Sequence, residues 1–599
     1  MCGIVYKSNF YNPTDYNLFT LACDTLNHRG PDSFGYLFTK NHSFGHKRLS
    51  IIDIANGSQP MSILNHHLIY NGEIYNQEEL VKLLNKNNIK LENHSDTLLL
   101  LKLLMTYGMN TLNKLNGIFS FVYEADDKVI AARDMFGVKP LYYTIIDNDL
   151  LIASEIKAIL KYKNEALIDS EGLCELFGMG PSHSQGKTIF KNIYELKPGH
   201  MILFDKVNGL RIERYYQIPV YKNTLTYKQA VLKTEEVLSN AIKRQMVSDV
   251  GISTFLSGGL DSSIISTIVA KNKENLDTYN IDYQGNDEFK PNEFEITKDL
   301  DYAKIVSEDI GSNLHCVAIN NKDLCENLRT AVDLRDTPGM TDIDSSLYFL
   351  SQNIAKKHKV SMSGECADEL FGGYSWFYKH DKEMKTFPWI RNIDFKNRLL
   401  NEKWRNKLKL DEYIKKEYDM AVNEAPVLMG ESDNDKKHRI MTYLNIKYFM
   451  TNLLDRKDRM TMGASLEVRV PFCDKEVVEL LYNMPYKYKY RYNKEKKLLR
   501  DAYKNVVVKD IIKRKKSPYP KSNSSEYDES VKGMLLKCLD DKSSVLYELI
   551  DIDFLKGIIE NDEEFDVPWY GQLMRKTSLL AYLYQIDYWF KKYNVRIVD

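Results

Sequence analysis

The spacing of apolar residues divides the chain into two parts. From Gly117 to Leu160, short segments rich in β-branched and aromatic residues recur roughly every eight to twelve residues, separated by Asp/Asn turns. This rhythm predicts antiparallel sheet. Between Tyr227 and Val247, apolar residues instead recur at 231/232, 237/238, 241/242 and 246/247, which is the stripe of a helix. We therefore expect a domain boundary at 206–226.

Beyond this boundary, predicted strands and helices alternate. The strands ISTFL, TYNIDY and VSMSGE are interleaved with helical segments such as SSIISTIVAK, LDYAKIVSEDI and SLYFLSQNIAKKH. Such alternation indicates a parallel sheet covered by helices. Residues 380–450 and 475–599 have mainly helical patterns. We expect an α+β domain of antiparallel sheets flanked by helices, followed by an α/β parallel-sheet domain with a helical C-terminal part.

Size and charge narrow the classes of partner. A chain of 599 residues with 43% hydrophobic content is too long for a single core to be the best expectation. Lys+Arg (82) and Asp+Glu (83) nearly cancel, which removes the global electrostatic reason to expect a nucleic acid or an anionic membrane. We expect small-molecule substrates instead.

The compartment is predicted from what the sequence lacks. The longest apolar runs are shorter than the roughly 20 residues that a membrane helix requires. The N-terminal segment MCGIVYKSNF has neither the basic nor the apolar region of a signal peptide. We therefore expect a soluble, cytoplasmic protein with no membrane partner. The subunit arrangement stays open, with a homodimer as one alternative.

Cys2 is distinguished from the other cysteines by its position. The chain has eight cysteines, scattered without a CxxC or Cys/His cluster, so neither disulfides nor a structural zinc site is favoured. Removal of Met1 would expose Cys2 as the first residue and place its thiol beside a free α-amine. This amine, with a pKa of about 8, can act as the base for the thiol. Any chain can begin with Met-Cys, so the interpretation of Cys2 as a nucleophile depends on the segments that follow it.

Four segments after Cys2 carry groups suited to binding a free amino acid. They are HRGPD (28–32), HKRLSIID (46–53), YNGEIYN (70–76) and HSD (94–96). A cation can hold the carboxylate of such a ligand, and anions can hold its ammonium group. Taken singly, Asn71-Gly72 could be a hairpin turn and Asp96 a helix N-cap. In this order after Cys2, the segments resemble the glutaminase domain of class II amidotransferases, which are N-terminal nucleophile enzymes.

This resemblance covers residues 2–205 and implies a role for each group. Cys2 would attack the amide of glutamine, while the Asn71 side chain and the Gly72 N–H would form the oxyanion hole. The implied glutamine-binding residues, which include a cation and two anions for the two charged ends of glutamine, are Arg48, Leu49, Ser50, Ile51, Ile52, Asn71, Gly72, Glu73 and Asp96.

A second candidate site begins at ISTFLSGGLDSSIIS (252–266). The segment passes from an apolar strand through small residues into a helix, so backbone N–H groups and the helix dipole can face a phosphate. Asp261 can carry Mg²⁺ beside the phosphates. SGGLDSS resembles the pyrophosphate-binding loop of enzymes that split ATP into AMP and pyrophosphate. GPSHSQGKT (180–188) is similar to a Walker A loop but has one residue too many between its glycines, and we reject it.

Further segments extend the resemblance over most of residues 2–525. SMSGECADELFGGY (361–374) carries Glu365, Asp368 and Glu369, and it is followed by LDRKDRMTMGASLEVRVPFCD (454–474) and YNKEKKLLRDAY (492–503). The combination resembles glutamine-dependent asparagine synthetases. The family implies a general base or substrate anchor at Glu365, a metal ligand at Asp368 and a catalytic lysine at Lys496.

The same resemblance implies an ATP site with Mg²⁺ as cofactor, held by Asp261 and Asp368. The ATP-binding residues that it implies are Leu256, Ser257, Gly258, Gly259, Asp261, Ser262, Ser263, Ile281, Ser363 and Gly364. The basic residues of RKKSPYPK, namely Arg514, Lys515, Lys516 and Lys521, are expected to border this site. A solvent-exposed basic loop is the alternative interpretation.

The expected domains are therefore a glutaminase domain (2–205), a linker (206–226) and a synthetase domain (227–599). The expected substrates are glutamine, aspartate and ATP, with ammonia transferred to a β-aspartyl-AMP intermediate. Two segments depart from the usual family pattern, namely RDTPGMTDIDSS (335–346) and Cys366-Ala367. These departures weaken the prediction that aspartate is the acceptor. The alternatives are a related ligase that adenylates another carboxylate, a non-catalytic homologue, and an ATP pyrophosphatase that modifies nucleic acid.

Overall fold

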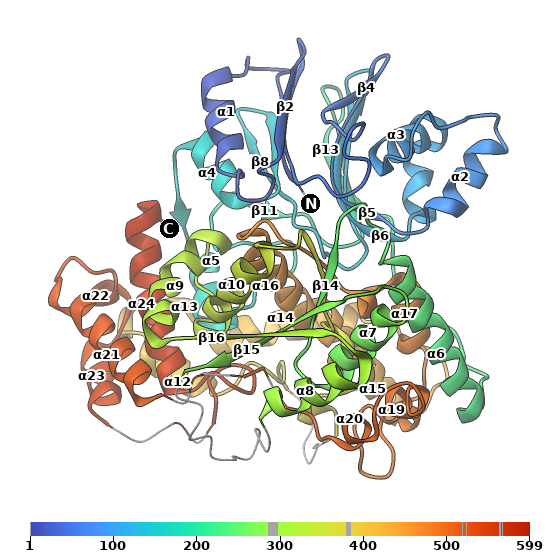
Figure 1. Cartoon of the computed structure of the whole chain (residues 1–599). Coiled ribbons are helices and arrows are strands. Elements are labelled where there is room, and N and C mark those ends of the chain that lie inside the picture. The colour runs from blue at the N-terminus through green and yellow to red at the C-terminus, as the bar shows by residue number, and fades with distance from the viewer. Residues whose placement is uncertain are drawn as a thin grey trace.

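The computed structural model places two sheet-containing domains one above the other (Figure 1). It describes residues 2–284, 298–378, 385–517, 519–520, 522, 524–561, 565 and 567–599. The N-terminal domain forms the upper part of Figure 1, and the C-terminal domain forms the lower part.

One antiparallel sheet of the N-terminal domain has the strand order β11-β8-β9-β1-β3-β2. Its strands are β1 (Gly3–Ser8), β2 (Ser33–Phe38), β3 (His42–Arg48), β8 (Tyr142–Ile146), β9 (Asp149–Ala153) and β11 (Tyr194–Glu195). β1 lies between β3 and β9, with Gly3 opposite Lys47 and Ser8 opposite His42. The residue that follows Met1 is thereby placed at one end of a central strand.

The second antiparallel sheet has the order β13-β12-β7-β6-β5-β4. Its strands are β4 (Met61–Ile63), β5 (His66–Ile74), β6 (Gly117–Ala125), β7 (Lys128–Arg133), β12 (His200–Asp205) and β13 (Gly209–Arg214). Buried side chains such as Ile4 and Phe44 from one sheet pack against Ile69, Val122 and Ile202 from the other. The antiparallel sheet predicted between Gly117 and Leu160 is confirmed.

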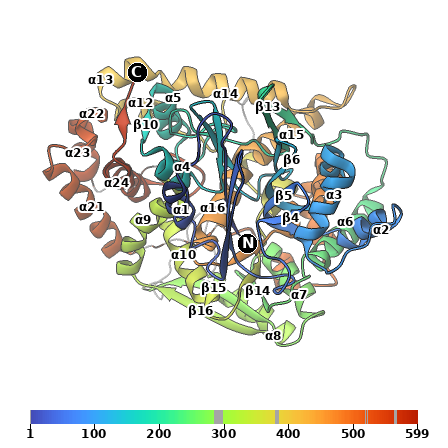
Figure 2. The ribbon, with the colours of Figure 1, turned by 90° about the horizontal axis from the view of Figure 1, so that it is seen from above.

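Helices flank the two sheets on their outer sides (Figure 2). α1 (Tyr16–Asp24) and α4 (Ile156–Lys163) lie beside the first sheet, while α2 (Gln77–Asn85) and α3 (Asp96–Tyr107) lie beside the second. The burial of apolar side chains between sheets and helices explains why the strands between 117 and 153 are so rich in apolar residues. The result is the α+β domain of antiparallel sheets flanked by helices that the sequence predicts.

The first domain extends beyond residue 205. β13 pairs with β12 across a hairpin in which Leu203 lies opposite Arg211, so the sheet continues to Arg214 within the expected linker of 206–226. The helical stripe predicted from Tyr227 is confirmed as α6 (Tyr227–Arg244), which starts at a capping box formed by Thr226 and Gln229. The end of the chain returns to the first domain, because β19 (Arg596–Ile597) pairs with β10 (Leu167–Ile168).

The C-terminal domain contains a parallel sheet with the order β16-β15-β14-β17-β18. The strands are β14 (Ile252–Phe255), β15 (Asp277–Tyr283), β16 (Asn313–Ile319), β17 (Val360–Met362) and β18 (Glu467–Arg469). The α/β parallel-sheet fold is confirmed. The sequence did not predict β16, whose side chains are largely exposed, or the short β18.

Helices surround this sheet and form the rest of the domain. Those that pack directly against the sheet are α7 (Leu260–Ala270), α8 (Asp299–Ile310), α10 (Asp342–Ala355) and α16 (Thr451–Met462). α9 (Asn321–Arg335) packs on α10 and α16. The others are α11 (Ala367–Phe371), α12 (Ile393–Leu399), α13 (Glu402–Leu408), α14 (Leu410–Glu424), α15 (Asp433–Leu444), α17 (Lys475–Tyr482), α18 (Tyr486–Lys489), α19 (Lys497–Ala502), α20 (Lys509–Lys513), α21 (Ser525–Asp540), α22 (Leu546–Leu549), α23 (Ile552–Glu560) and α24 (Lys576–Tyr593). One further helix, α5 (Ser170–Cys174), belongs in sequence to the first domain. The helical C-terminal part is confirmed.

Buried ion pairs join the two domains along α16. Arg29 Nη1 lies 2.7 Å from Glu155 Oε1 and 2.8 Å from Asp458 Oδ2. Lys139 Nζ lies 3.0 Å from Asp458 Oδ1. Breaking one partner of such a buried pair leaves an uncompensated charge, which is strongly destabilising. These contacts therefore hold the domains in one arrangement.

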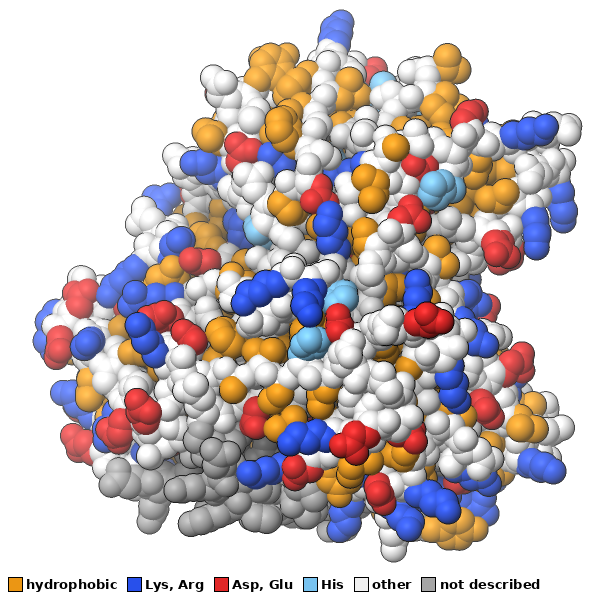
Figure 3. All heavy atoms as spheres, viewed as in Figure 1, with side chains coloured by type: hydrophobic (Ala, Val, Ile, Leu, Met, Phe, Trp, Pro, Cys, Tyr) orange, Lys and Arg blue, Asp and Glu red, His pale blue; other side chains and the backbone are white. Residues whose placement is uncertain are grey.

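Charged side chains of both signs are interspersed over the face shown in Figure 3. This distribution agrees with a formal net charge of −1. Within the described part of the chain, no helix combines the length and the apolar character that crossing a membrane requires.

Candidate functional sites

Cys2 lies directly before β1 and contacts Asn71 in the second sheet. Its backbone N–H donates to Asn71 Oδ1 at 2.9 Å, and Arg29 Nε donates to the Cys2 carbonyl at 3.1 Å. Burial raises the pKa of the Cys2 thiol. A base beside the thiol would therefore be needed to form the thiolate at neutral pH.

Asn71 and Gly72 lie inside β5, so the alternative interpretation of this pair as a hairpin turn is wrong. The Asn71 Nδ2 group is buried and has no hydrogen-bond partner among the described residues. A Cβ atom at position 72 would lie 2.2 Å from the Ile118 carbonyl oxygen, so the neighbouring strand requires glycine here. Asn71 therefore offers an unused donor beside Cys2, as an oxyanion hole requires.

The Arg48 side chain holds the loop that follows it. Its guanidinium donates to the carbonyls of Ile54 at 2.9 Å and Asp53 at 3.0 Å. Of the expected glutamine-binding residues in this loop, Leu49, Ser50, Ile51 and Ile52 are all buried. Asp249 of the C-terminal domain makes two contacts with this loop. Its carboxylate accepts from the Asp53 N–H at 2.8 Å, and its backbone N–H donates to the Ile51 carbonyl at 3.2 Å.

Glu73 and Asp96 lie with a charged pair from the C-terminal domain. Arg469 Nη2 lies 3.4 Å from Glu73 Oε1, and Arg469 Nε lies 2.6 Å from Glu467 Oε1. Burial, with Glu467 as the next cause, raises the pKa of Glu73 well above its usual range. Burial also raises the pKa of Asp96 to about 6. Asp96 is the first residue of α3 and Ser95 is its N-cap, so Asp96 is not the cap itself.

Sequence reasoning missed Glu467 and Arg469. Both lie in β18, within the family-like segment 454–474, and both are fully buried. The segment Glu-Val-Arg-Val-Pro (467–471) was the available signal, but nothing local in it points to a site in the other domain.

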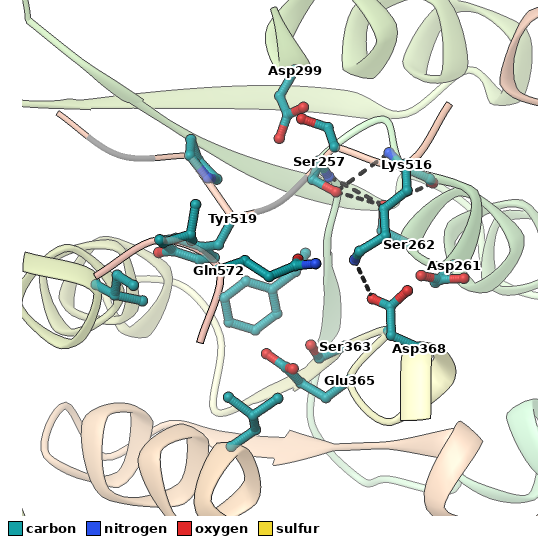
Figure 4. A pocket seen from close by; sticks show the side chains of 18 of the residues that line it. Ser257, Asp261, Ser262, Asp299, Ser363, Glu365, Asp368, Lys516, Tyr519 and Gln572 are labelled. Atoms are coloured by element: carbon teal, nitrogen blue, oxygen red, sulfur yellow. Dashed lines mark hydrogen bonds and ion pairs between the residues drawn. The ribbon is translucent and has the colours of Figure 1, made fainter. Parts of the chain in front are cut away.

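The second candidate site is a cavity of about 260 Å³ in the C-terminal domain (Figure 4). Among the residues expected to bind ATP, those that line the cavity are Leu256, Ser257, Gly259, Asp261, Ser262, Ile281, Ser363 and Gly364. The N-terminus of α7 opens onto it, as a phosphate site requires. The SGGLDSS loop and the end of β17 are thus brought together.

Gly258 and Ser263 do not line this cavity. Gly258 has a φ of +69°, and a Cβ atom there would lie 2.6 Å from the Tyr302 side chain, so this residue shapes the turn. The Ser263 hydroxyl donates to the Gly259 carbonyl at 2.7 Å and is fully buried. Both residues therefore stabilise the loop without lining the cavity.

Lys496 connects the two carboxylates expected to bind metal. Its Nζ atom lies 2.5 Å from Asp261 Oδ2 and 2.6 Å from Asp368 Oδ1. Lys516 Nζ lies 2.6 Å from Asp368 Oδ2, a contact drawn in Figure 4. Burial disfavours the charged form of Lys496, but Asp261 and Asp368 outweigh burial and raise the lysine pKa. Burial opposes ionisation of Asp368 also, yet Lys496 and Lys516 lower its pKa to about 2.

Glu365 and Glu369 have different surroundings. Glu365 lines the cavity and lies 3.3 Å from both Arg456 Nη2 and Lys457 Nζ. Burial opposes ionisation of Glu365, but Lys457 and Arg456 lower its pKa. Glu369 does not line the cavity and accepts from Tyr374 at 2.6 Å. Arg456 and Lys457, which sequence reasoning did not single out, therefore belong to the site.

The basic segment at 514–516 borders the cavity. Arg514, Lys515 and Lys516 all line it. The Arg514 guanidinium donates to the Ser257 carbonyl at 3.3 Å and pairs with Asp299 at 2.5 Å. This segment is therefore held against the SGGLDSS loop. Lys521 lies outside the described residues.

The rejected Walker-like segment 180–188 lies at the domain interface. Lys187 pairs with Glu171 and Glu417, each at 2.8 Å, so its ammonium group is engaged by acids of both domains. The described chain that follows leads into β11 without a helix of its own. The segment lacks the helix N-terminus that a P-loop requires.

Comparison with known proteins divides the chain into the same two domains. A family model described as asparagine synthase matches residues 233–591, and one described as glutamine amidotransferase domain matches residues 1–216. The glutamine-hydrolysing asparagine synthetase 3 of Bacillus subtilis is 43% identical over 100% of both chains. Asparagine synthetase 1 of the same organism is 30% identical over 87% of each chain. A putative asparagine synthetase of Methanocaldococcus jannaschii is 31% identical over 62% of this chain and 76% of its own.

Proposed function

Because the chain belongs to the family of glutamine-hydrolysing asparagine synthetases, we propose that it converts aspartate to asparagine, using ATP and the amide nitrogen of glutamine. The observation that carries the proposal is the presence of both sites in one chain. A buried cysteine faces an unused amide donor in one domain, and a lysine between two carboxylates lines a cavity in the other.

In the glutaminase half-reaction, the Cys2 thiolate attacks the amide carbon of glutamine. The carbon–nitrogen bond breaks, ammonia leaves, and water then hydrolyses the thioester to glutamate. Asn71 Nδ2 and the Gly72 N–H are the proposed donors to the oxyanion. Once Met1 is removed, the Cys2 nitrogen that now donates to Asn71 Oδ1 becomes the free amine, and it supplies the base that the buried thiol needs.

In the synthetase half-reaction, an oxygen of the aspartate β-carboxylate attacks the α-phosphorus of ATP. The bond from this phosphorus to the pyrophosphate breaks and β-aspartyl-AMP forms. Ammonia then attacks the carbonyl carbon and AMP leaves. We propose that Lys496 and the cations at 514–516 stabilise the pyrophosphate. All of them line one cavity with the SGGLDSS loop, which supports this role. Glu365 is the proposed general base or anchor for the acceptor.

The residues present fit the expected Mg²⁺. Asp261 and Asp368 supply the carboxylate oxygens that Mg²⁺ prefers, and Asp261 Oδ1 is buried without a hydrogen-bond partner among the described residues. We propose that these two residues hold Mg²⁺ together with the phosphates of ATP. The ion would supply positive charge to the departing pyrophosphate.

A second candidate is a related ligase that adenylates a different carboxylate. It is supported by Met340, Ile343 and Leu347, which form an apolar wall of the cavity within and beside the unusual segment 335–346. Mass spectrometry of products from ATP, glutamine and a panel of amino-acid acceptors distinguishes the two. Asparagine with AMP is expected. Amidation of another acceptor in preference to aspartate would overturn the proposed substrate.

A further inference from the structure

Four side chains suited to metal binding lie together at the outer end of the N-terminal domain. His42 begins β3, His67 lies near the start of β5, Glu124 lies near the end of β6, and Asp127 lies in the turn to β7. β2 forms a hairpin with β3, and β4 forms a hairpin with β5. Both hairpins reach the top of Figure 1, away from the C-terminal domain. These four residues are called the hairpin cluster below.

The ligand atoms of His42, Glu124 and Asp127 converge, and His67 lies beside Glu124. His42 Nε2 lies 3.5 Å from Glu124 Oε1 and 3.0 Å from Asp127 Oδ1. His67 Nε2 lies 4.0 Å from the other carboxylate oxygen of Glu124. Around a tetrahedral zinc ion with bonds of about 2.0–2.2 Å, neighbouring ligand atoms are separated by about 3.3 Å. The ligand atoms of His42, Glu124 and Asp127 lie within 4.8 Å of one another, so side-chain movements of an ångström or so would bring these three groups onto one ion. His67 would have to move farther to become the fourth ligand.

Hydroxyl groups orient both imidazole rings toward the carboxylate. His42 Nδ1 lies 2.8 Å from Tyr6 Oη, and His67 Nδ1 lies 2.8 Å from Ser62 Oγ. In each ring Nδ1 is therefore engaged. Nε2 of His42 is directed at Asp127 and Glu124, and Nε2 of His67 is directed at Glu124. Histidines that bind metal ions have this arrangement, because a hydrogen bond at one ring nitrogen fixes the ring and leaves the other nitrogen for the metal.

The negative charge of the hairpin cluster also favours a bound cation. The Glu124 side chain is only 5% exposed, and among the described residues no lysine or arginine pairs with it. Asp127 adds a second carboxylate, and His42 lies within 3.5 Å of both. A buried carboxylate without a cation is costly. A divalent ion would remove this cost.

We propose that the hairpin cluster is a zinc site. Two imidazoles with two carboxylates match the preference of zinc for mixed nitrogen and oxygen ligands and not the all-oxygen preference of Mg²⁺. The ion would join β3 of one sheet to β5 and β6 of the other. Ser8, opposite His42, and Gly3, beside Cys2, are at opposite ends of β1, which is about 20 Å long. The proposed role is therefore structural.

Zinc titration of the full chain, after treatment with a chelator, tests this proposal. Calorimetry is expected to show one high-affinity zinc ion per chain, and Co²⁺ in its place should give a tetrahedral absorption spectrum without sulfur-to-cobalt charge transfer. His67→Gln and Asp127→Ala should each weaken zinc binding by at least about tenfold. Both side chains are partly exposed, at 16% and 56%, so we expect these variants to fold.

His66→Gln is the matched control. His66 precedes His67 in β5, so its side chain points to the opposite face, where its ring lies 2.6 Å from the Tyr123 hydroxyl. The His66→Gln variant should bind zinc as the unmodified chain does. Failure of the unmodified chain to bind zinc would overturn the proposal. So would undiminished zinc binding in both cluster variants, or a cobalt spectrum dominated by thiolate charge transfer.

Discussion

Arg469 Nη2 lies 3.4 Å from Glu73 Oε1, so a residue of the C-terminal sheet contacts a residue of the N-terminal domain that is proposed to bind glutamine. Arg469 also donates to the Gln245 carbonyl at 2.7 Å and pairs with Glu467 at 2.6 Å. The proposed glutamine pocket is therefore completed by the synthetase domain. This contact joins the proposed glutamine pocket directly to the sheet of the synthetase domain.

Arg469→Met should weaken glutamine use without abolishing synthesis from ammonia. The substitution leaves Glu73 and Glu467 facing each other without the cation between them, which favours protonation of Glu73 and weakens its hold on the α-ammonium group. We expect the KM for glutamine to rise about tenfold or more. Steady-state kinetics with each nitrogen source measures this. Arg244→Met, which removes a nearby cation paired with Asp474, is the control, and an equal effect there would contradict the specific role of Arg469.

Glutamine binding should weaken in acid because of Asp96. Burial raises the pKa of this carboxyl to about 6, so the anion proposed to hold the α-ammonium group is lost as the pH falls through that value. The KM for glutamine should then rise toward about tenfold for each pH unit below 6. The pH profile of glutaminase activity measures this. Asp96→Asn should show a high KM without this rise, and an unchanged profile in that variant would assign the titration to another group.

Cys2→Ala should separate the two half-reactions. The variant has no nucleophile for the glutamine amide, but ammonia from solution can still reach the adenylated acceptor. Glutamate release should fall to background, while ammonia-dependent formation of AMP and asparagine persists. If the folded variant also lost ammonia-dependent synthesis, the assignment of Cys2 to glutamine hydrolysis alone would fail.

Lys496→Met and Asp261→Asn should lose synthesis with either nitrogen source. Each substitution removes a charge from the cavity where pyrophosphate is proposed to leave, and one such group is typically worth about 10²–10³-fold in rate. Pyrophosphate release with ammonia as the nitrogen source is the measurement. Lys497→Met is the matched control, because Lys497 pairs with Asp501 and does not line the cavity. Full activity of Lys496→Met would exclude a catalytic role for this lysine.

The segments that carry local patterns could be predicted from the sequence. The antiparallel strands between 117 and 153 and the helix α6 follow from apolar spacing, and the loop 256–263 follows from small residues between a strand and a helix. These features depend on neighbours in the chain. The sequence therefore indicated both folds and the strand-to-helix loop of the second site.

The contacts made across the chain could not be predicted in this way. β18 has three residues, which is too short for a recognisable period, and its importance arises from pairing with β17 and from reaching Glu73. Glu365 and Glu369 lie in one acidic run, yet only Glu365 lines the cavity, because α11 directs Glu369 toward Tyr374. The hairpin β12–β13 likewise carries the first domain into the expected linker.

The central claim is that one chain transfers glutamine nitrogen to an adenylated aspartate, and a double-label experiment tests it most directly. Aspartate carrying ¹⁸O in its β-carboxylate is supplied with glutamine carrying ¹⁵N in its amide, with unlabelled ATP, and the products are separated and weighed by mass spectrometry. The account predicts asparagine that contains ¹⁵N and AMP that contains one ¹⁸O atom in its phosphate. Label in inorganic phosphate together with ADP, or asparagine without ¹⁵N, would contradict it.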